Sequence, residues 1–205
     1  MSARSAGVVL AAGSSSRMGE PKQLLSFHGR PLLEHVVRAA CGSRLDEVVV
    51  VLGAHLAPIR AGVEWGRSRV VSNPEHAGGL STSIRAGISA LGPDAERAMI
   101  ILGDQPEVSA ELFDRLLDAQ AGSGLPAAAL SIDGLLHPPV VLARELWPDI
   151  LALAGDIGCR RIIRARPELV APVAASAPGG HPIDIDTPED WRRMGYGASA
   201  SPADS

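Results

Sequence analysis

Short apolar segments rich in Val, Ile and Leu alternate along this chain with longer segments of helical periodicity. The apolar segments cover residues 7–12, 47–52, 69–72 and 98–102, and the helical patterns cover residues 31–41, 54–61, 80–91 and 110–121. Strands that are apolar throughout are typical of parallel sheets, because crossover helices bury both faces of such sheets. The alternation predicts an α/β fold of three layers around a mainly parallel sheet.

The pattern loosens in the C-terminal half. Short strands are expected at residues 127–132, 139–142, 169–174 and 182–185, with helices at residues 144–154 and 157–164. Antiparallel edge strands are expected in this half. A last helix opens at Thr187, whose hydroxyl can cap it, and the acids Glu189 and Asp190 favour the positive end of the helix dipole.

Length and composition restrict the domain count and the class of partner. A chain of 205 residues with 46% hydrophobic content can bury one sizeable core, so we expect a single domain over residues 1–194. Residues 195–205 are small and polar and are expected to form a disordered tail. A net charge of −4 without charged blocks, and only 3% aromatic residues, argue against nucleic acid or membrane as partners.

The cysteines and the N-terminal sequence indicate a compartment. Cys41 and Cys159 are far apart and lack metal-ligand spacing, so neither a disulfide framework nor a zinc site is indicated. The apolar run at residues 8–12 is too short for a signal peptide or a membrane span. These features predict a cytoplasmic protein.

The most informative segment is L-A-A-G-S-S-S-R-M-G-E-P-K at residues 10–22, which follows the first predicted strand. Ligands of open α/β sheets bind at the carboxyl ends of strands. Small residues let the backbone approach a base or phosphate, and the N–H groups from Gly13 to Ser16 can form an anion-binding concavity. Arg17 and Lys22 add positive charge, so we expect a triphosphate as the ligand.

Alternatives to this interpretation of the loop differ in strength. A Ser/Gly turn with two solvated cations would produce the same residues. A Walker A loop is excluded, because five residues separate Gly13 from Gly19 and Lys22 lies three further on. The dinucleotide-binding fingerprint is absent as well.

Three acidic residues at predicted strand ends are candidate metal ligands. Asp104 lies in L-G-D-Q-P directly after an apolar strand, and alternation sends Asp184 and Asp186 of D-I-D-T-P-E-D to the same face. Carboxylates together with phosphate oxygens are the ligands that Mg²⁺ prefers. Alternatively, Asp104 begins a turn before Pro106, and Asp186 or Thr187 caps the last helix.

Two further groups of polar residues are candidates for substrate contact. Asn73 precedes the sequence G-G-L-S-T-S-I at residues 78–84, which would form a polar lip of N–H and hydroxyl groups at a helix start. Ser81 could instead, or in addition, cap that helix. His137, Asp156 and Arg160 form the second group; His137 could equally be a partly buried structural histidine and Asp156 a helix cap.

Together, the loop, G-D-Q-P, N-P…G-L-S-T-S-I and D-I-D-T-P-E-D resemble the nucleotidyltransferases of molybdenum cofactor maturation, over residues 6–194. This family shares a Rossmann-like fold with sugar-phosphate nucleotidyltransferases. The resemblance implies that Arg17, Lys22 and Asp104 are catalytic and that Mg²⁺ is bound by Asp104 with at least one of Asp184 and Asp186. The residues implied to bind the nucleotide are Leu10, Ala11, Ala12, Gly13, Ser14, Ser15, Arg17, Lys22, Asn73, Gly79, Leu80 and Ser81.

The H-P and G-D-x-G-C-R segments resemble the molybdopterin cytidylyltransferase branch, in which they line the acceptor side and would involve His137, Asp156 and Arg160. Leu136 and Cys159 depart from the Gly and Ala that are usual there. Ala12 implies CTP, because relatives with Gly at this position tend to use GTP. The implied reaction moves CMP onto the phosphate of molybdopterin and releases pyrophosphate, and a molybdoenzyme would receive the product.

Other functions remain open at this point. A related enzyme could use GTP or another phosphate acceptor, such as methylerythritol phosphate. A non-catalytic chaperone that binds molybdopterin is the alternative from a different class, although Arg17, Lys22 and Asp104 together argue against it.

Overall fold

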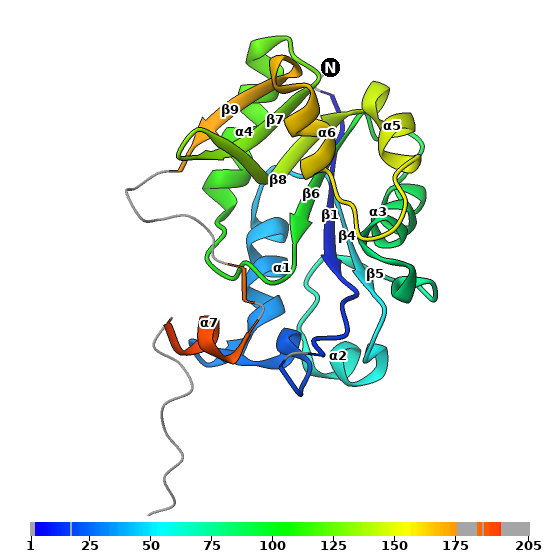
Figure 1. The fold of residues 1–205 in the computed structure, drawn as a ribbon, viewed down its shortest axis with the longest axis vertical. Coiled ribbons are helices and arrows are strands. Elements are labelled where there is room, and N and C mark those ends of the chain that lie inside the picture. Colours follow the sequence, from blue (N-terminus) through cyan, green and yellow to red (C-terminus); the bar gives the residue numbers. More distant parts are fainter. Residues whose placement is uncertain (1–2, 17, 176–183, 186, 194–205) are drawn as a thin grey trace, which may run out of the picture.

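The computed structural model describes residues 3–16, 18–175, 184–185 and 187–193 (Figure 1). Its centre is a sheet of seven strands in the order β5-β4-β1-β6-β8-β7-β9. The strands are β1 (Ser5–Ala11), β4 (Glu47–Leu52), β5 (Arg69–Ser72), β6 (Arg97–Leu102), β7 (Ala127–Ile132), β8 (Leu135–Ala143) and β9 (Val170–Ala174). The predicted fold class, a mainly parallel Rossmann-like α/β fold, is confirmed.

The antiparallel strand expected in the C-terminal half is β8, and it lies inside the sheet. It pairs antiparallel with both β6 and β7, whereas β7 and β9 are parallel. Asp133 and Gly134 both have positive φ, 50° and 78°, and they form the tight turn between β7 and β8. Such a turn directs β8 back along β7. In the sheet, β8 lies between β6 and β7, and β9 takes the edge.

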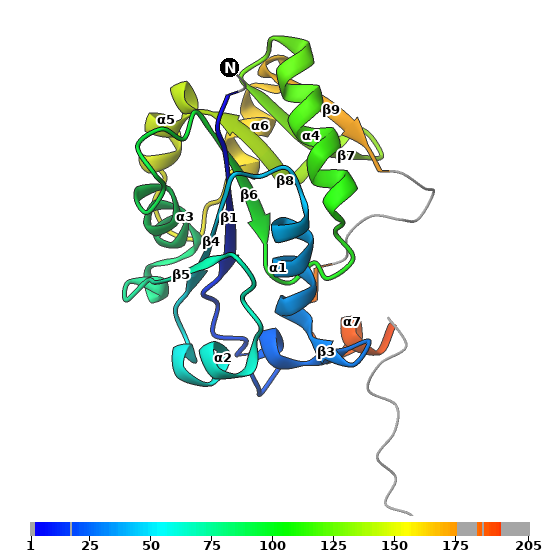
Figure 2. The same ribbon diagram turned by 180° about the vertical axis from the view of Figure 1, so that it is seen from behind.

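Helices cover both faces of the sheet (Figures 1 and 2). Consecutive residues of β1 point to opposite faces, so Val8 and Leu10 belong to one core, while Val9 and Ala11 belong to the other. The first core is covered by α3 (Leu80–Ser89), α5 (Trp147–Leu151) and α6 (Arg160–Ala165). The second is covered by α1 (Leu32–Gly42), α2 (Leu56–Gly62) and α4 (Ala110–Ser123).

Most element boundaries agree with the sequence patterns, and the exceptions have local causes. The helix expected at residues 144–154 is divided into the 3₁₀ turn η3 (Arg144–Leu146) and α5, which has Pro148 in its first turn. Ser109 caps α4 by accepting a hydrogen bond from Leu112 N. Ser81 does not cap α3, because the N-cap position is Gly79. The strand expected at residues 182–185 and the tail at residues 195–205 lie mostly or wholly outside the described residues.

The C-terminal segment packs against a small hairpin that the sequence did not predict. The hairpin comprises β2 (Ser26–Phe27) and β3 (Arg30–Pro31), and Figure 2 shows helix α7 (Pro188–Arg193) beside it. Phe27 forms an apolar cluster with Leu32, Ile185 and Trp191. Thr187 caps α7, since Asp190 N donates to its hydroxyl at 3.2 Å. This packing fixes Ile185, and with it the neighbouring Asp184. No helix among the described residues is long and apolar enough to cross a membrane.

Candidate active site

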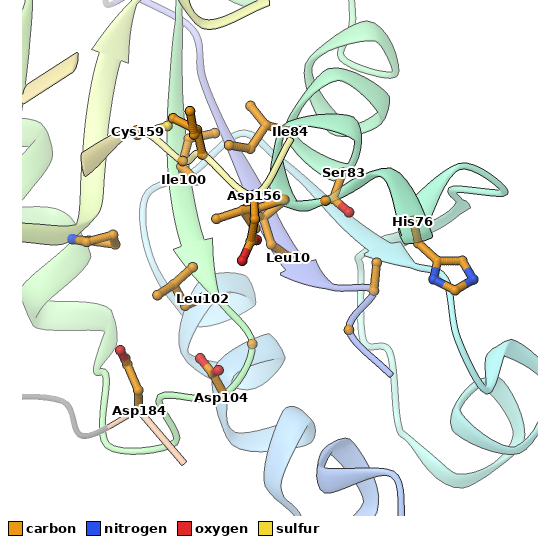
Figure 3. Close-up of a pocket in the computed structure, with 18 of the residues that line it drawn as sticks. Leu10, His76, Ser83, Ile84, Ile100, Leu102, Asp104, Asp156, Cys159 and Asp184 are labelled. Carbon is orange, nitrogen blue, oxygen red and sulfur yellow. The ribbon is translucent and has the colours of Figure 1, made fainter. Parts of the chain in front are cut away.

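A cavity of about 820 Å³ opens at the carboxyl ends of β1 and β6 (Figure 3). Its wall is formed by the loops after these strands, the start of α3 and the segment that precedes α6. It therefore lies at the sheet edge where the sequence placed the ligand. The predicted site residues that line it are Leu10, Ala12, Gly13, Ser14, Lys22, Gly79, Leu80, Asp104, Asp156, Arg160 and Asp184.

The loop after β1 presents free N–H groups. Within the described part of the chain, the N–H groups of Gly13, Ser14, Ser15 and Ser16 donate to no protein acceptor. Gly13 and Ser14 line the cavity. Successive unpaired amides form a concavity of positive partial charge, which suits the oxygens of a phosphate chain.

Lys22 and Asp104 meet in the wall of the same cavity. The Lys22 ammonium donates to Asp104 Oδ2 at 2.7 Å, and both side chains are largely buried, with 14% and 20% of their surface exposed. Lys22 begins the 3₁₀ turn η1 (Lys22–Leu24), and Asp104 lies two residues after the end of β6. The cation and the carboxylate expected to handle the nucleotide thus share one cavity wall.

Asp184 joins Asp104 at the same end of the cavity (Figure 3). Backbone Ile185 N donates to the Asp104 carbonyl at 3.2 Å, which ties the two segments together. The Asp184 carboxylate accepts from Gln105 Nε2 at 2.7 Å and from an Arg160 nitrogen at 3.3 Å. No group of three metal-binding side chains occurs among the residues that the structure describes. Arg17 and Asp186 lie outside those residues, so their predicted roles remain predictions.

The polar lip at the start of α3 packs against the segment before α6. Gly79 has φ +99°, and a Cβ added there would lie 2.4 Å from the carbonyl carbon of Gly155. Ser81 N donates to Gly155 O at 3.2 Å, and Leu80 lies against Gly158. The nucleotide segment and the acceptor segment named from sequence therefore form one continuous wall.

Five of the predicted site residues that the structure describes do not line the cavity. These are Ala11, Ser15, Asn73, Ser81 and His137. Asn73 is buried, and its amide donates to the hydroxyls of Thr82 and Ser83 at 2.9 and 3.0 Å. Ser81 is fully buried inside α3, and His137 pairs with Leu130 across β7 and β8. Asn73, Ser81 and His137 contribute to the packing behind the wall, whereas Ser15 presents its N–H group in the loop after β1.

Other residues of the wall were not predicted. Gln23, His76, Cys159 and Arg161 line the cavity, and Gln105 contacts Asp184. Gln23 directly follows the P-K that ends the loop segment, and a polar residue directly before two leucines is the only sequence signal that marks it. Cys159 is buried, and desolvation raises the pKa of its thiol to about 12. It therefore serves as an apolar part of the wall.

The family of the chain follows from comparison with known proteins. Residues 7–170 match the model of the MobA-like NTP transferase domain. This match covers most of the chain. The chain belongs to the MobA-like NTP transferase family and is a nucleotidyltransferase of that family.

Relatives resemble the chain over nearly its whole length. Nicotine blue oxidoreductase of Paenarthrobacter nicotinovorans is 32% identical, over 92% of this chain and 95% of the relative. Molybdenum cofactor guanylyltransferase of Xanthomonas euvesicatoria is also 32% identical, over 92% and 93%. The structure of Rv0371c from Mycobacterium tuberculosis H37Rv superimposes with a TM-score of 0.82 at 28% identity, covering 93% and 97% of the chains. A structure of Rv0371c with manganese gives a TM-score of 0.78 at 26% identity, covering 93% and 97%.

Proposed function

We propose that the protein transfers CMP from CTP to the phosphate of molybdopterin, forming a cytosine dinucleotide cofactor and pyrophosphate. The observation that carries this proposal is the arrangement of one cavity. Free N–H groups at Gly13 and Ser14 lie in the same wall as Lys22, and Asp104 and Asp184 lie at one end of it. An amide cradle and a cation suit a polyphosphate, and paired carboxylates suit the cation that accompanies it.

Ala12 supports CTP as the donor. Ala12 lines the cavity, as Leu10 does, and its methyl group takes space at this wall that a glycine would leave open to a base. Cytosine is the smaller base and guanine the larger. The related molybdenum cofactor guanylyltransferase is the observation that favours GTP, which remains the second candidate donor.

The carboxylates fit a divalent cation. Asp104 and Asp184 offer hard oxygen atoms at one end of the cavity, and Gln105 holds one Asp184 oxygen in place. Magnesium would supply neutralisation of phosphate charge at this point. The manganese complex of Rv0371c accords with a divalent cation in this family. The chain's own part is to orient these oxygens and to place Lys22 beside them.

The transfer itself needs positioning rather than a protein nucleophile. A phosphate oxygen of the acceptor attacks the α-phosphorus in line, the bond to the bridging oxygen breaks, and pyrophosphate leaves with the electron pair. Lys22 is placed to stabilise the negative charge that develops on the departing pyrophosphate. The Gly13–Ser16 amides would hold the same group before and after bond cleavage.

The acceptor would enter along the segment before α6. Asp156 lines the cavity, and its side chain lies between Leu102 and Ser83 in the view of Figure 3. Arg160 is committed to Asp184, whereas Arg161 is exposed and also lines the cavity. We assign Asp156 and Arg161 to contact with the acceptor. We assign Arg160 to holding Asp184, the proposed metal ligand, beside the acceptor.

A pyrophosphate-release assay with CTP or GTP, each with and without molybdopterin and Mg²⁺, tests the proposal. We expect release only when CTP, molybdopterin and Mg²⁺ are all present. Pyrophosphate release with GTP and molybdopterin, but not with CTP and molybdopterin, would overturn the choice of CTP as the donor. Binding of molybdopterin without release from either nucleotide would instead establish a non-catalytic chaperone.

A further inference from the structure

The carbonyl groups of residues 11–15, at the end of β1 and the start of the loop that follows, are all occupied. Ala11 O and Gly13 O both accept from Gln23 Nε2, each at 3.1 Å. Ala12 O accepts from Ala54 N at 3.2 Å. Ser14 O accepts from His55 Nε2 at 3.2 Å, and Ser15 O accepts from Met18 N at 2.8 Å. Five consecutive carbonyls are therefore held by protein donors, while the N–H groups of residues 13–16 donate to none among the described residues.

This division follows from the geometry of the peptide bond. In a planar trans peptide, the carbonyl oxygen and the N–H of the next residue point in opposite directions. When Gln23 holds the carbonyl of Gly13, it turns the N–H of Ser14 away from itself. Carbonyl oxygens carry negative partial charge and would repel a phosphate, so holding the carbonyls of residues 11–15 leaves the N–H groups of this stretch to face the ligand.

Gln23 is committed entirely to this loop. Its side chain is 2% exposed and contributes two N–H groups, which serve Ala11 and Gly13. Its Oε1 accepts from Ser15 Oγ at 3.3 Å, and Ser15 Oγ accepts in turn from Lys22 N at 3.1 Å. Ser15 has φ +53°, a backbone conformation uncommon for a residue other than glycine. The buried side-chain amide of Gln23 thus connects the end of β1 with Ser15, and through the Ser15 hydroxyl with the backbone of Lys22.

We propose that Gln23 is the positioning residue that sets the polarity of the triphosphate cradle. It fixes the Ala11 and Gly13 carbonyls away from the ligand, and through Ser15 it fixes the backbone of Lys22. The inference rests on the proposed function, because it takes a nucleoside triphosphate as the ligand. Gln23 would act through the backbone of the loop and would not itself need to contact the phosphates.

The substitution Gln23→Met tests the inference, because it keeps the side-chain length and removes the amide. The Ala11 and Gly13 carbonyls lose their donor, so the loop can rotate one of them toward the ligand. We expect the Kd for CTP with Mg²⁺, measured by calorimetry, to rise about tenfold. We expect kcat at saturating CTP to change less than about threefold, since the loop binds ground state and transition state alike.

Hydrogen exchange separates positioning from general destabilisation. In the wild type, CTP should slow the exchange of the amides at residues 13–16, and in Gln23→Met that protection should be lost. Gln120→Met is the matched control, because Gln120 also donates to a backbone carbonyl, that of Leu125 at 3.1 Å, but lies on α4 away from the cavity. The control should lose stability without any change in the affinity for CTP.

The outcomes distinguish this inference from the function on which it rests. Equal CTP affinity and equal amide protection in wild type and Gln23→Met would overturn the inference alone. An equal loss of affinity in Gln120→Met would overturn it too, because the effect would then be general. If the wild type bound neither CTP nor GTP, the proposed function itself would fail.

Discussion

The ammonium of Lys22 lies 2.7 Å from the carboxylate of Asp104, although 82 positions separate the two residues in the sequence. One belongs to the loop after β1 and the other to the end of β6, and these strands are neighbours in the sheet. Parallel pairing therefore brings together the cation and the carboxylate that we propose to bind the phosphates and the metal ion. A nucleotide bound there would have its phosphates beside the Lys22 ammonium and its accompanying cation beside the Asp104 carboxylate.

The first prediction concerns this pair. Lys22→Ala and Asp104→Asn should each lower turnover at least about a hundredfold, because preorganised charge at the phosphates is lost. Circular dichroism should show the fold retained. The exposed pair Arg4–Asp94, at 3.0 Å, is the control, and Asp94→Asn should leave turnover unchanged. Near-normal turnover in either site variant would contradict the assigned mechanism.

The second prediction concerns the choice of base. Ala12→Gly removes a methyl group from the cavity wall and gives a larger base more room. We expect the ratio of kcat/KM for GTP to that for CTP to rise by about tenfold, the usual effect of one methyl-sized change in a pocket. Competition between the two nucleotides in one reaction measures this ratio directly. An unchanged ratio would show that Ala12 does not determine the choice between CTP and GTP.

The third prediction concerns the wall between the two substrate segments. Gly79→Ala places a Cβ 2.4 Å from the backbone of Gly155 at a residue with φ +99°. The variant should lose about 1–3 kcal/mol of unfolding free energy, and its KM for the nucleotide should rise. Gly122→Ala on α4 is the control, because nothing lies within 4 Å of the added Cβ. That control should be neutral or slightly stabilising in urea denaturation.

The fourth prediction concerns the thiols and alkaline pH. Burial raises the pKa of Cys159 to about 12 from an ordinary value of 9.0, so the folded state holds this proton more tightly than the unfolded state. The resulting stability is fully present below the unfolded pKa and is lost as pH rises toward the folded pKa. Between about pH 8 and pH 10 the loss from this group should approach ~1.4 kcal/mol.

Comparison of two variants isolates that contribution. Urea denaturation across this pH range should show a shallower alkaline decline for Cys159→Ala than for the wild type. Gly122→Ala should keep the wild-type slope, because that substitution removes no ionisable group. In the native protein, iodoacetamide should modify the partly exposed Cys41 well before the buried Cys159. Identical slopes for all three proteins would contradict the assignment.

The sequence predicts those parts of the fold that depend on local pattern. The bounds of β4, β5 and β7 were expected correctly, because each is a run of apolar or small residues with breaks at both ends. The place of β8 was not expected, because the order of strands depends on which neighbour is available after the Asp133–Gly134 turn. Periodicity alone carries no information on that choice.

The candidate site shows the same division between local and long-range information. Motifs identified Lys22 and Asp104, since their residue types and strand-end positions are visible in the sequence. Gln23 was missed, because its function lies in contacts of a side chain with the backbone of a different segment. Arg160 was expected at the acceptor, but its ion pair with Asp184 depends on a segment far away in sequence.

A crystal structure with a non-hydrolysable CTP analogue and Mn²⁺ would test the central claim most directly, with anomalous scattering locating the metal. We predict that the triphosphate accepts hydrogen bonds from the amides of residues 13–16 and from Lys22, with Mn²⁺ bound to Asp104. A nucleotide bound outside this cavity, or a triphosphate that touches neither the loop nor Lys22, would contradict the account.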